Sequence, residues 1–218
     1  MSGYRDSAHC IQGFNLLILD IDDGNTTEEL IDLLLGKYTY LLYHTKRSTE
    51  AAPRFRVIMP MSHVLKLNES NYAEFMQNVY SWLPFSCDEQ TSQRSRKWLT
   101  CKKTYSYNSG ELIDVLPFIP KTKEAEKRKK IFNDSLSLSN LERWFVSNSE
   151  EGNRSNQLIK YGLALVDANQ DLNTVQDKVI SLNNKLPNPL PEIELLKTIM
   201  VTVANRIHKR DTQQKEEA

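Results

Sequence analysis

Two aspartates near the start of the chain stand two residues apart at the end of an apolar run. Asp20 and Asp22 close the segment 15–22 (NLLILDID), whose pattern predicts a buried strand. Side chains two apart in a strand point to the same face, so the two carboxylates stand side by side. Such a pair repels itself unless a cation neutralises it, and carboxylate oxygens suit Mg²⁺ or Mn²⁺ in phosphoryl transfer. The pattern therefore favours a divalent-metal site, while the alternative is that Asp22 and Asp23 only form a turn and cap a helix.

A third acid, Asp88, lies in the segment 85–99 (FSCDEQTSQRSRKWL). If the fold brings this loop back to the end of the first strand, Asp88 completes a set of three carboxylates with Asp20 and Asp22. The alternative is an exposed loop acid beside Glu89, and Asp88 taken alone favours that alternative.

Arginines supply the opposite charge. In PRFRVIMP (53–60), Arg54 and Arg56 are two apart in a predicted strand and project from the same face. Paired guanidinium groups suit a polyphosphate, because each offers a fixed fork of donors. Arg96, with Ser95 before it, is expected to add a further phosphate contact. The alternative is that these arginines sit on an edge strand and pair with surface carboxylates.

The elements that must position these residues are mixed α and β in the first half of the chain. Thr26 and Glu29 form a capping box that predicts a short helix over 30–35, and apolar residues at helical spacing predict an amphipathic helix over 72–83. Besides 15–22, strands are predicted at 38–45 and 54–61, with two more around 97–105 and 111–116. We expect one α+β domain over residues 1–120.

Strand patterns vanish after Pro120. Residues 121–137 begin with KTKEAEKRKK, a charged and helix-favouring linker. Apolar periodicity then predicts a small all-α domain over 138–210, and its last helix should bury Ile193, Leu196, Met200, Val203 and Ile207. The breaker stretch 186–191 (LPNPLP) separates the last two helices, and residues 211–218 are expected to be a disordered tail.

Composition excludes several classes of protein. With 39% hydrophobic and 26% charged residues, no apolar run near the ~20 residues of a membrane helix and no signal-peptide pattern, the chain is expected to be cytoplasmic, with no membrane partner. The three cysteines lack metal-ligand or disulfide spacing. The net charge is zero, but binding to nucleic acid depends on local charge, and basic residues cluster at 46–56, 94–103 and 121–130. The alternative is that these are three solvated segments, and this alternative is favoured for 121–130.

The order of these parts resembles the archaeo-eukaryotic primase superfamily, in the branch found in phages and plasmids. LLILDIDDG is similar to that family's first acidic motif, PRFRVIMPMS to its arginine-bearing strand and 88–97 to its third acidic motif; GELIDVLPFIP resembles its closing strand. In the second half, GNRSNQLIKYGLALVDAN and LPNPLPEIELLKTIMVTVANR are similar to the helical domain that follows the catalytic domain in many such primases. The resemblance covers roughly residues 14–207.

The resemblance implies a fold, a reaction and roles for named residues. The fold is an RRM-like catalytic domain with a mixed or antiparallel sheet, followed by the helical primase domain. The reaction is two-metal synthesis of primers on single-stranded DNA from NTPs or dNTPs, in phage or plasmid replication; a replicative helicase is a further partner that it allows. The metal ligands would be Asp20, Asp22 and Asp88, which bind two Mg²⁺ or Mn²⁺ ions. The nucleotide would be bound by Lys46, Arg47, Ser48, Arg54, Arg56, Ser95 and Arg96, and the nucleic acid by Lys102, Lys103, Asn153, Arg154 and Asn156.

Two departures from the family leave alternatives open. Relatives carry a histidine that touches the nucleotide phosphates, and here Ser48 takes its position, with His44 earlier in the loop. In addition, only about twenty residues precede the acidic strand, fewer than is usual in the family. A non-catalytic, nucleic-acid-binding replication subunit is therefore the main rival to an active primase. A rolling-circle endonuclease is disfavoured, because no two histidines have His-x-His spacing.

Overall fold

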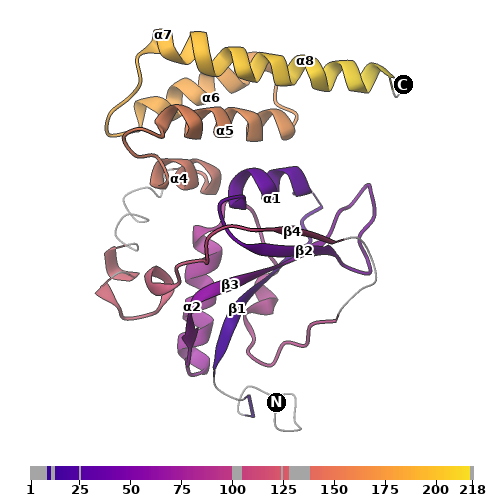
Figure 1. Ribbon diagram of the computed structural model, residues 1–218, viewed down its shortest axis with the longest axis vertical. Coiled ribbons are helices and arrows are strands. Elements are labelled where there is room, and N and C mark those ends of the chain that lie inside the picture. Colours follow the sequence, from indigo (N-terminus) through magenta and orange to yellow (C-terminus); the bar gives the residue numbers. More distant parts are fainter. Residues whose placement is uncertain are drawn as a thin grey trace. The chain divides into compact units, whose positions relative to one another are not determined.

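The computed structural model describes residues 9–10, 13–24, 26–99, 105–123, 125–127 and 138–216, without the side chains of residues 91 and 213–216. The chain divides into two compact units, Met1–Ser137 and Leu138–Ala218. Figure 1 shows strands with helices in the first unit and helices in the second.

The first unit is built on a four-stranded antiparallel sheet. Its strands are β1 (Phe14–Ile21), β2 (Tyr40–His44), β3 (Phe55–Leu65) and β4 (Tyr105–Asn108), in the spatial order β1-β3-β2-β4. Because β3 pairs antiparallel with both β1 and β2, the latter two strands run parallel to each other and are joined by the crossover helix α1 (Glu28–Leu35). The expected α+β class is confirmed.

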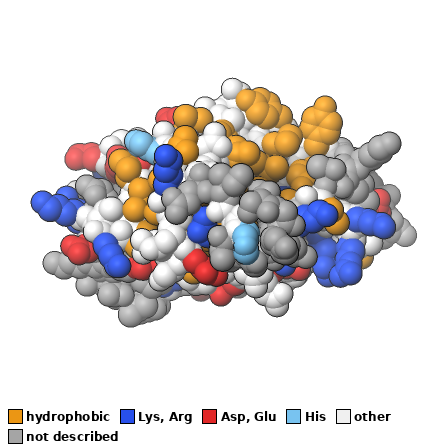
Figure 2. Space-filling model, turned by 90° about the horizontal axis from the view of Figure 1, so that it is seen from below, with side chains coloured by type: hydrophobic (Ala, Val, Ile, Leu, Met, Phe, Trp, Pro, Cys, Tyr) orange, Lys and Arg blue, Asp and Glu red, His pale blue; other side chains and the backbone are white. Residues whose placement is uncertain are grey.

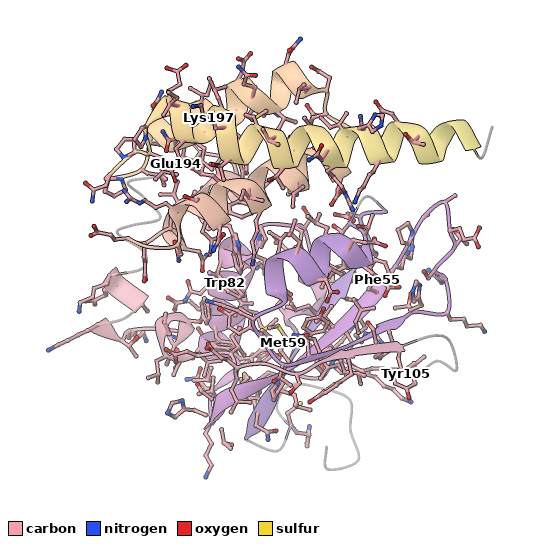
Figure 3. The ribbon with its side chains drawn as sticks, turned by 45° about the horizontal axis from the view of Figure 1, so that its top comes forward. Phe55, Met59, Trp82, Tyr105, Glu194 and Lys197 are labelled. Atoms are coloured by element: carbon pink, nitrogen blue, oxygen red, sulfur yellow. The ribbon has the colours of Figure 1, made fainter. Side chains whose placement is uncertain are left out.

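Alternation along the strands gives the sheet one buried face. Side chains that point to this face are at most 2% exposed: Leu17, Leu19, Ile21, Leu42, Phe55, Val57 and Met59. Amphipathic helices supply the rest of this core, from Ile31 and Leu35 of α1 and from Phe75, Met76 and Val79 of α2 (Glu69–Trp82). Figure 3 shows Phe55 and Met59 in this interior. The residues between them along each strand point to the other face, which carries Asp20 and Arg56.

The start of α1 differs from the prediction. The helix is capped by Thr27, whose side chain accepts a hydrogen bond from the Leu30 amide, and not by Thr26. Thr26 is instead held by Asp23, whose two carboxylate oxygens accept bonds from the Thr26 amide at 3.0 Å and hydroxyl at 2.8 Å. Asp23 thus organises the turn after the acidic strand.

The last two predicted strands are partly wrong. Residues 97–99 are not in a strand, residues 100–104 lie outside the described part, and β4 begins only at Tyr105. Over 111–116 the chain makes isolated parallel bridges, Tyr38 with Glu111 and Met61 with Ile113, before the 3₁₀ turn Leu116–Phe118. The alternating sequence pattern predicted full strands at 97–105 and 111–116, but the chain forms only the short strand β4 and isolated bridges there.

The second unit is helical. It contains α4 (Asn140–Ser147), α5 (Arg154–Asp167), α6 (Leu172–Asn184), α7 (Glu192–Glu194) and α8 (Met200–Glu216), with the π-helical turn Leu195–Ile199 between the last two. Within the expected disordered tail, residues 211–216 belong to α8. Most of the expected linker, 121–137, lies outside the described residues. Of the helices described, none combines the length and the apolar character that crossing a membrane requires.

Gly162 of α5 packs close against Val203 of α8. A methyl group on Gly162 would lie 2.6 Å from Val203 Cγ2, well inside contact distance. We expect Gly162→Ala to lower the free energy of unfolding by about 1–2 kcal/mol, because overpacking outweighs the roughly 1 kcal/mol gain in helix propensity. Thermal unfolding of Gly162→Ala, Val203→Ala and the double variant measures this. The double variant should lose less than the two singles together, and an increase in melting temperature for Gly162→Ala alone would contradict the packing argument.

Glu142 couples the stability of the second unit to pH. Its carboxylate accepts bonds from the Ser139 amide at 2.9 Å, in a capping box at the start of α4, and from Lys185 Nζ of α6 at 3.1 Å. Burial opposes ionisation, but these hydrogen bonds outweigh it and lower the pKa of Glu142 below its ordinary value of 4.5. The stabilisation is therefore present above about pH 4.5 and is lost as pH falls through the folded-state pKa.

Glu142→Gln should accordingly destabilise the protein by about 1 kcal/mol at pH 7 and by almost nothing at pH 3. Urea unfolding at the two pH values tests this, with the exposed Glu151→Gln as control. A loss that is the same at both pH values would exclude the charged form of Glu142 as the cause.

Candidate active site

The backbone brings the third acid to the first two. The Asp88 amide donates a hydrogen bond to the Asp20 carbonyl oxygen, with N and O 2.8 Å apart. Residue 88 therefore lies against the outer edge of β1, at the end where Asp20 and Asp22 stand. The Cys87 thiol lies within the field of this acidic cluster: its pKa is raised by burial and then by the charges of Asp23, Asp20, Asp22 and Asp88.

Each of these three acids has an arginine partner. Arg56 Nη2 lies 3.0 Å from Asp20 Oδ2, Arg54 Nη1 lies 3.7 Å from Asp22 Oδ2, and Arg96 Nη2 lies 3.4 Å from Asp88 Oδ2. The first pair follows from the register, since Asp20 and Arg56 are directly opposite in β1 and β3. Because β3 lies between β1 and β2, Arg56 does not sit on an edge strand, and Arg54 directly precedes β3. The predicted metal ligands and three of the predicted phosphate ligands thus form one cluster of alternating charge.

Arg56 is the most buried member of this cluster, with only 11% of its side chain exposed, against 37% for Arg54. Its Nη1 donates to the Tyr43 hydroxyl at 3.0 Å and to the Leu99 carbonyl at 2.9 Å, and its guanidinium carbon lies 4.6 Å from the centre of the Trp98 ring. Burial alone would lower the pKa of Arg56, but the bonds to Tyr43 and Asp20 outweigh it and raise the pKa. Arg56 is a fixed positive charge that joins β1, β2 and the 98–99 segment.

Tyr43 and Trp98 are contributors that the sequence analysis missed. Tyr43 faces Arg56 only because β2 and β3 pair in this register, and Trp98 reaches Arg56 only because its segment lies over this face of the sheet. The run of Arg94, Arg96 and Trp98 at alternate positions is the one signal in the sequence that could have pointed to Trp98.

A cavity of about 230 Å³ lies beside β1, next to the acidic cluster. Arg96, which pairs with Asp88, lines it together with Arg94, Tyr72 and Trp98. Ser95 occupies the turn between the two arginines. Two guanidinium groups and three aromatic side chains, those of Phe14, Tyr72 and Trp98, give this cavity the means to hold an aromatic anion.

The loop after β2 is arranged differently from the expected phosphate site. Ser48 is buried, its hydroxyl accepts a bond from the Arg54 amide at 3.0 Å, and it lies 3.0 Å from His44 Nδ1. His44 Nε2 in turn lies 2.5 Å from Glu28 Oε1 of α1. Ser48 and His44 therefore fix the backbone that carries Arg54, while Lys46 and Arg47 are exposed in the turn between them.

Two candidates in the second unit, Asn153 and Arg154, have local structural roles, and Lys102 and Lys103 lie outside the described residues. Asn153 accepts from the Glu150 amide at 2.7 Å and donates to the Asn148 carbonyl at 3.1 Å, which shapes the loop before α5. Arg154 donates to the Asn188 carbonyl, and Asn156 is exposed on α5. Of the three, Asn156 has its side chain most open to solvent.

The arginine partners of the three aspartates limit what these carboxylates can bind. Among the residues that the structure describes, no three His, Cys, Asp or Glu side chains are grouped so that they could hold a metal ion. Carboxylates of Asp20, Asp22 and Asp88 offer the hard oxygen donors that Mg²⁺ or Mn²⁺ prefers, but they are turned to their arginines. Comparisons with family models, with curated proteins and with solved structures gave no match for this chain.

Proposed function

We propose that the protein is a metal-dependent nucleotidyltransferase that makes primers on single-stranded DNA in phage or plasmid replication. The observation that carries the proposal is the main-chain bond between Asp88 and Asp20, which brings a distant acid to the Asp20/Asp22 pair. Beside these acids lie Arg54, Arg56 and Arg96, the complement that a triphosphate needs. The resemblance of the sequence motifs to primases of the archaeo-eukaryotic superfamily supports the same reaction.

The residues divide into two roles. Asp20, Asp22 and Asp88 would hold Mg²⁺ or Mn²⁺, and the bound metal would supply a lowered pKa for an attacking 3′-hydroxyl and positive charge for the triphosphate. Arg54 and Arg96, both partly exposed, would leave their carboxylate partners and bind phosphate oxygens, and the cavity beside Arg96 would receive the nucleotide. Arg56 is too firmly bonded to leave Asp20 easily, so its charge would act from a fixed position.

The fold supports the RRM-like part of the proposal for three strands. Strands β1, β3 and β2, with α1 as the crossover, form the split β-α-β unit of ferredoxin-like sheets. In such sheets the fourth strand lies beside the first, whereas β4 here lies beside β2. That difference leaves the outer edge of β1 to the Asp88 segment.

One assay tests the proposed activity directly. The full chain is incubated with a single-stranded DNA template, labelled NTPs or dNTPs, and Mg²⁺ or Mn²⁺. We expect template-dependent incorporation that stops on chelation of the metal, and the two nucleotide series reveal which sugar is preferred. No incorporation in any combination would contradict the proposal.

The pairing of every acid with an arginine favours a second candidate, a non-catalytic replication subunit that binds nucleic acid and works with a helicase. Three Asp–Arg pairs are internally neutral and need no metal. In this case the protein would bind single-stranded DNA with the same affinity whether or not a divalent metal is present, and the incorporation assay would show no product.

A further inference from the structure

Two tyrosine rings stand exposed side by side on the edge strand β4. Tyr105 and Tyr107 are 68% and 65% exposed, which is unusual for large aromatic side chains in a strand. They are two residues apart, so both point to the same face of the sheet. Figure 3 shows Tyr105 at the outer margin of the sheet, away from the interior residues Phe55 and Met59.

The register places these rings in line with the acidic cluster. Along one row of the sheet, Tyr105 is opposite Tyr43, Tyr43 is opposite Arg56, and Arg56 is opposite Asp20, and the 98–99 segment covers Arg56 in the middle of this row. Three strand spacings of about 4.8 Å put Tyr105 roughly 14 Å from Asp20 along this row. That span corresponds to a few nucleotides of an extended strand.

The surroundings of the two rings are apolar and basic. Leu99, 68% exposed, adds an apolar side chain to the same face, where its carbonyl meets Arg56. The loop that leaves β2 beside Tyr105 presents Lys46 and Arg47, against one exposed acid, Glu50. On the face drawn in Figure 2, hydrophobic side chains gather mainly in one area and Lys and Arg side chains lie at several places around it.

We propose that Tyr105 and Tyr107 form a stacking platform for the bases of a single DNA strand, which passes from there toward the acidic cluster. The proposal rests on the proposed function for the direction of the strand, but the binding itself is independent of catalysis. Aromatic rings stack on any base, and nearby cations neutralise the phosphates, so such a platform binds without regard to sequence. A protein strand added to the edge of β4 is disfavoured, because β4 has only four residues with which to pair.

The test measures binding of a fluorescent oligothymidine to the full chain by anisotropy, without nucleotides or divalent metal. Tyr105→Ala/Tyr107→Ala should bind at least about tenfold more weakly than the wild type, because stacking on two rings is lost. Tyr105→Phe/Tyr107→Phe keeps both rings and should bind within about twofold of the wild type. Val64→Ala removes another exposed apolar side chain, 64% exposed on β3, and should change nothing.

The outcomes separate this proposal from the proposed function. If the wild type binds the oligonucleotide but incorporates no nucleotide, and the alanine variant binds weakly, the platform stands and the catalytic proposal fails. Equal affinity of the folded alanine variant and the wild type would overturn the platform, even if both incorporate nucleotides. Weak binding by the phenylalanine variant would also overturn it, because the hydroxyl groups and not the rings would then make the contact.

Discussion

Asp20→Ala is expected to reduce the free energy of unfolding by about 3–5 kcal/mol, because it leaves the buried guanidinium of Arg56 without its counter-charge. Only 14% of the Asp20 side chain and 11% of the Arg56 side chain are exposed, so water cannot replace the lost partner cheaply. The remaining bonds of Arg56, to Tyr43 and to the Leu99 carbonyl, do not neutralise its charge. Urea unfolding monitored by Trp fluorescence measures the loss.

The matched control for this prediction is the double variant Asp20→Ala/Arg56→Met. Removing both charges leaves no unpaired ion and keeps a long apolar side chain beside Trp98, so the double variant should be more stable than Asp20→Ala. A loss below about 1 kcal/mol for Asp20→Ala would show that the pair contributes no more than a surface salt bridge.

Asp88→Asn is expected to lower nucleotide incorporation at least a hundredfold while the protein remains folded. An amide is a much poorer ligand for a divalent cation than a carboxylate, and loss of one such electrostatic contribution typically costs two to three orders of magnitude. Folding should tolerate the change, because the bond that places residue 88 beside Asp20 is made by the backbone amide. Asp22→Asn, on a side chain that is 48% exposed, should behave in the same way.

Glu89→Gln is the control for this prediction, because it removes an exposed acid next to Asp88 without touching the proposed metal ligands. It should incorporate nucleotides at the wild-type rate. Circular dichroism and melting temperature of all variants would show that the folds are retained. Wild-type rates for both Asp22→Asn and Asp88→Asn would remove these acids from the catalytic site and favour the non-catalytic subunit.

Strands β1 and β3 and helix α2 were predictable because their patterns are long. The buried side chains of β1 and β3 alternate over many residues, and α2 repeats apolar residues over three turns. Strand β4, with four residues of which none is buried, has no such pattern. Its position beside β2 depends on pairing partners, which no local periodicity encodes.

The last helical segment shows a different limit. A regular helix would have buried Ile193 and Leu196, but these residues are 64% and 40% exposed, and Leu195 and Ile199 are buried instead. The π-helical turn Leu195–Ile199 takes more residues per turn than an α-helix, so the face that points inward shifts along the sequence. A prediction that assumes 3.6 residues per turn cannot follow such a shift.

The members of the candidate site were largely predictable, but their pairing was not. Alternation put Asp20 with Asp22 and Arg54 with Arg56 on common faces from sequence alone. That each acid faces one arginine follows from the antiparallel register of β1 and β3 and from the return of the 88–96 loop. The register joins residues that are tens of positions apart. Residue types and local spacing could therefore identify the acids and the arginines of the site, but not which arginine pairs with which acid.

Residue 88 is held beside Asp20 by its backbone N–H group, which every amino acid except proline possesses. Any residue other than proline at this position would therefore keep its side chain beside the end of β1. A histidine, cysteine or glutamate at position 88 would be placed beside the end of β1 in the same way. The backbone thus determines where the side chain of residue 88 lies, whereas the type of residue at this position determines its chemistry.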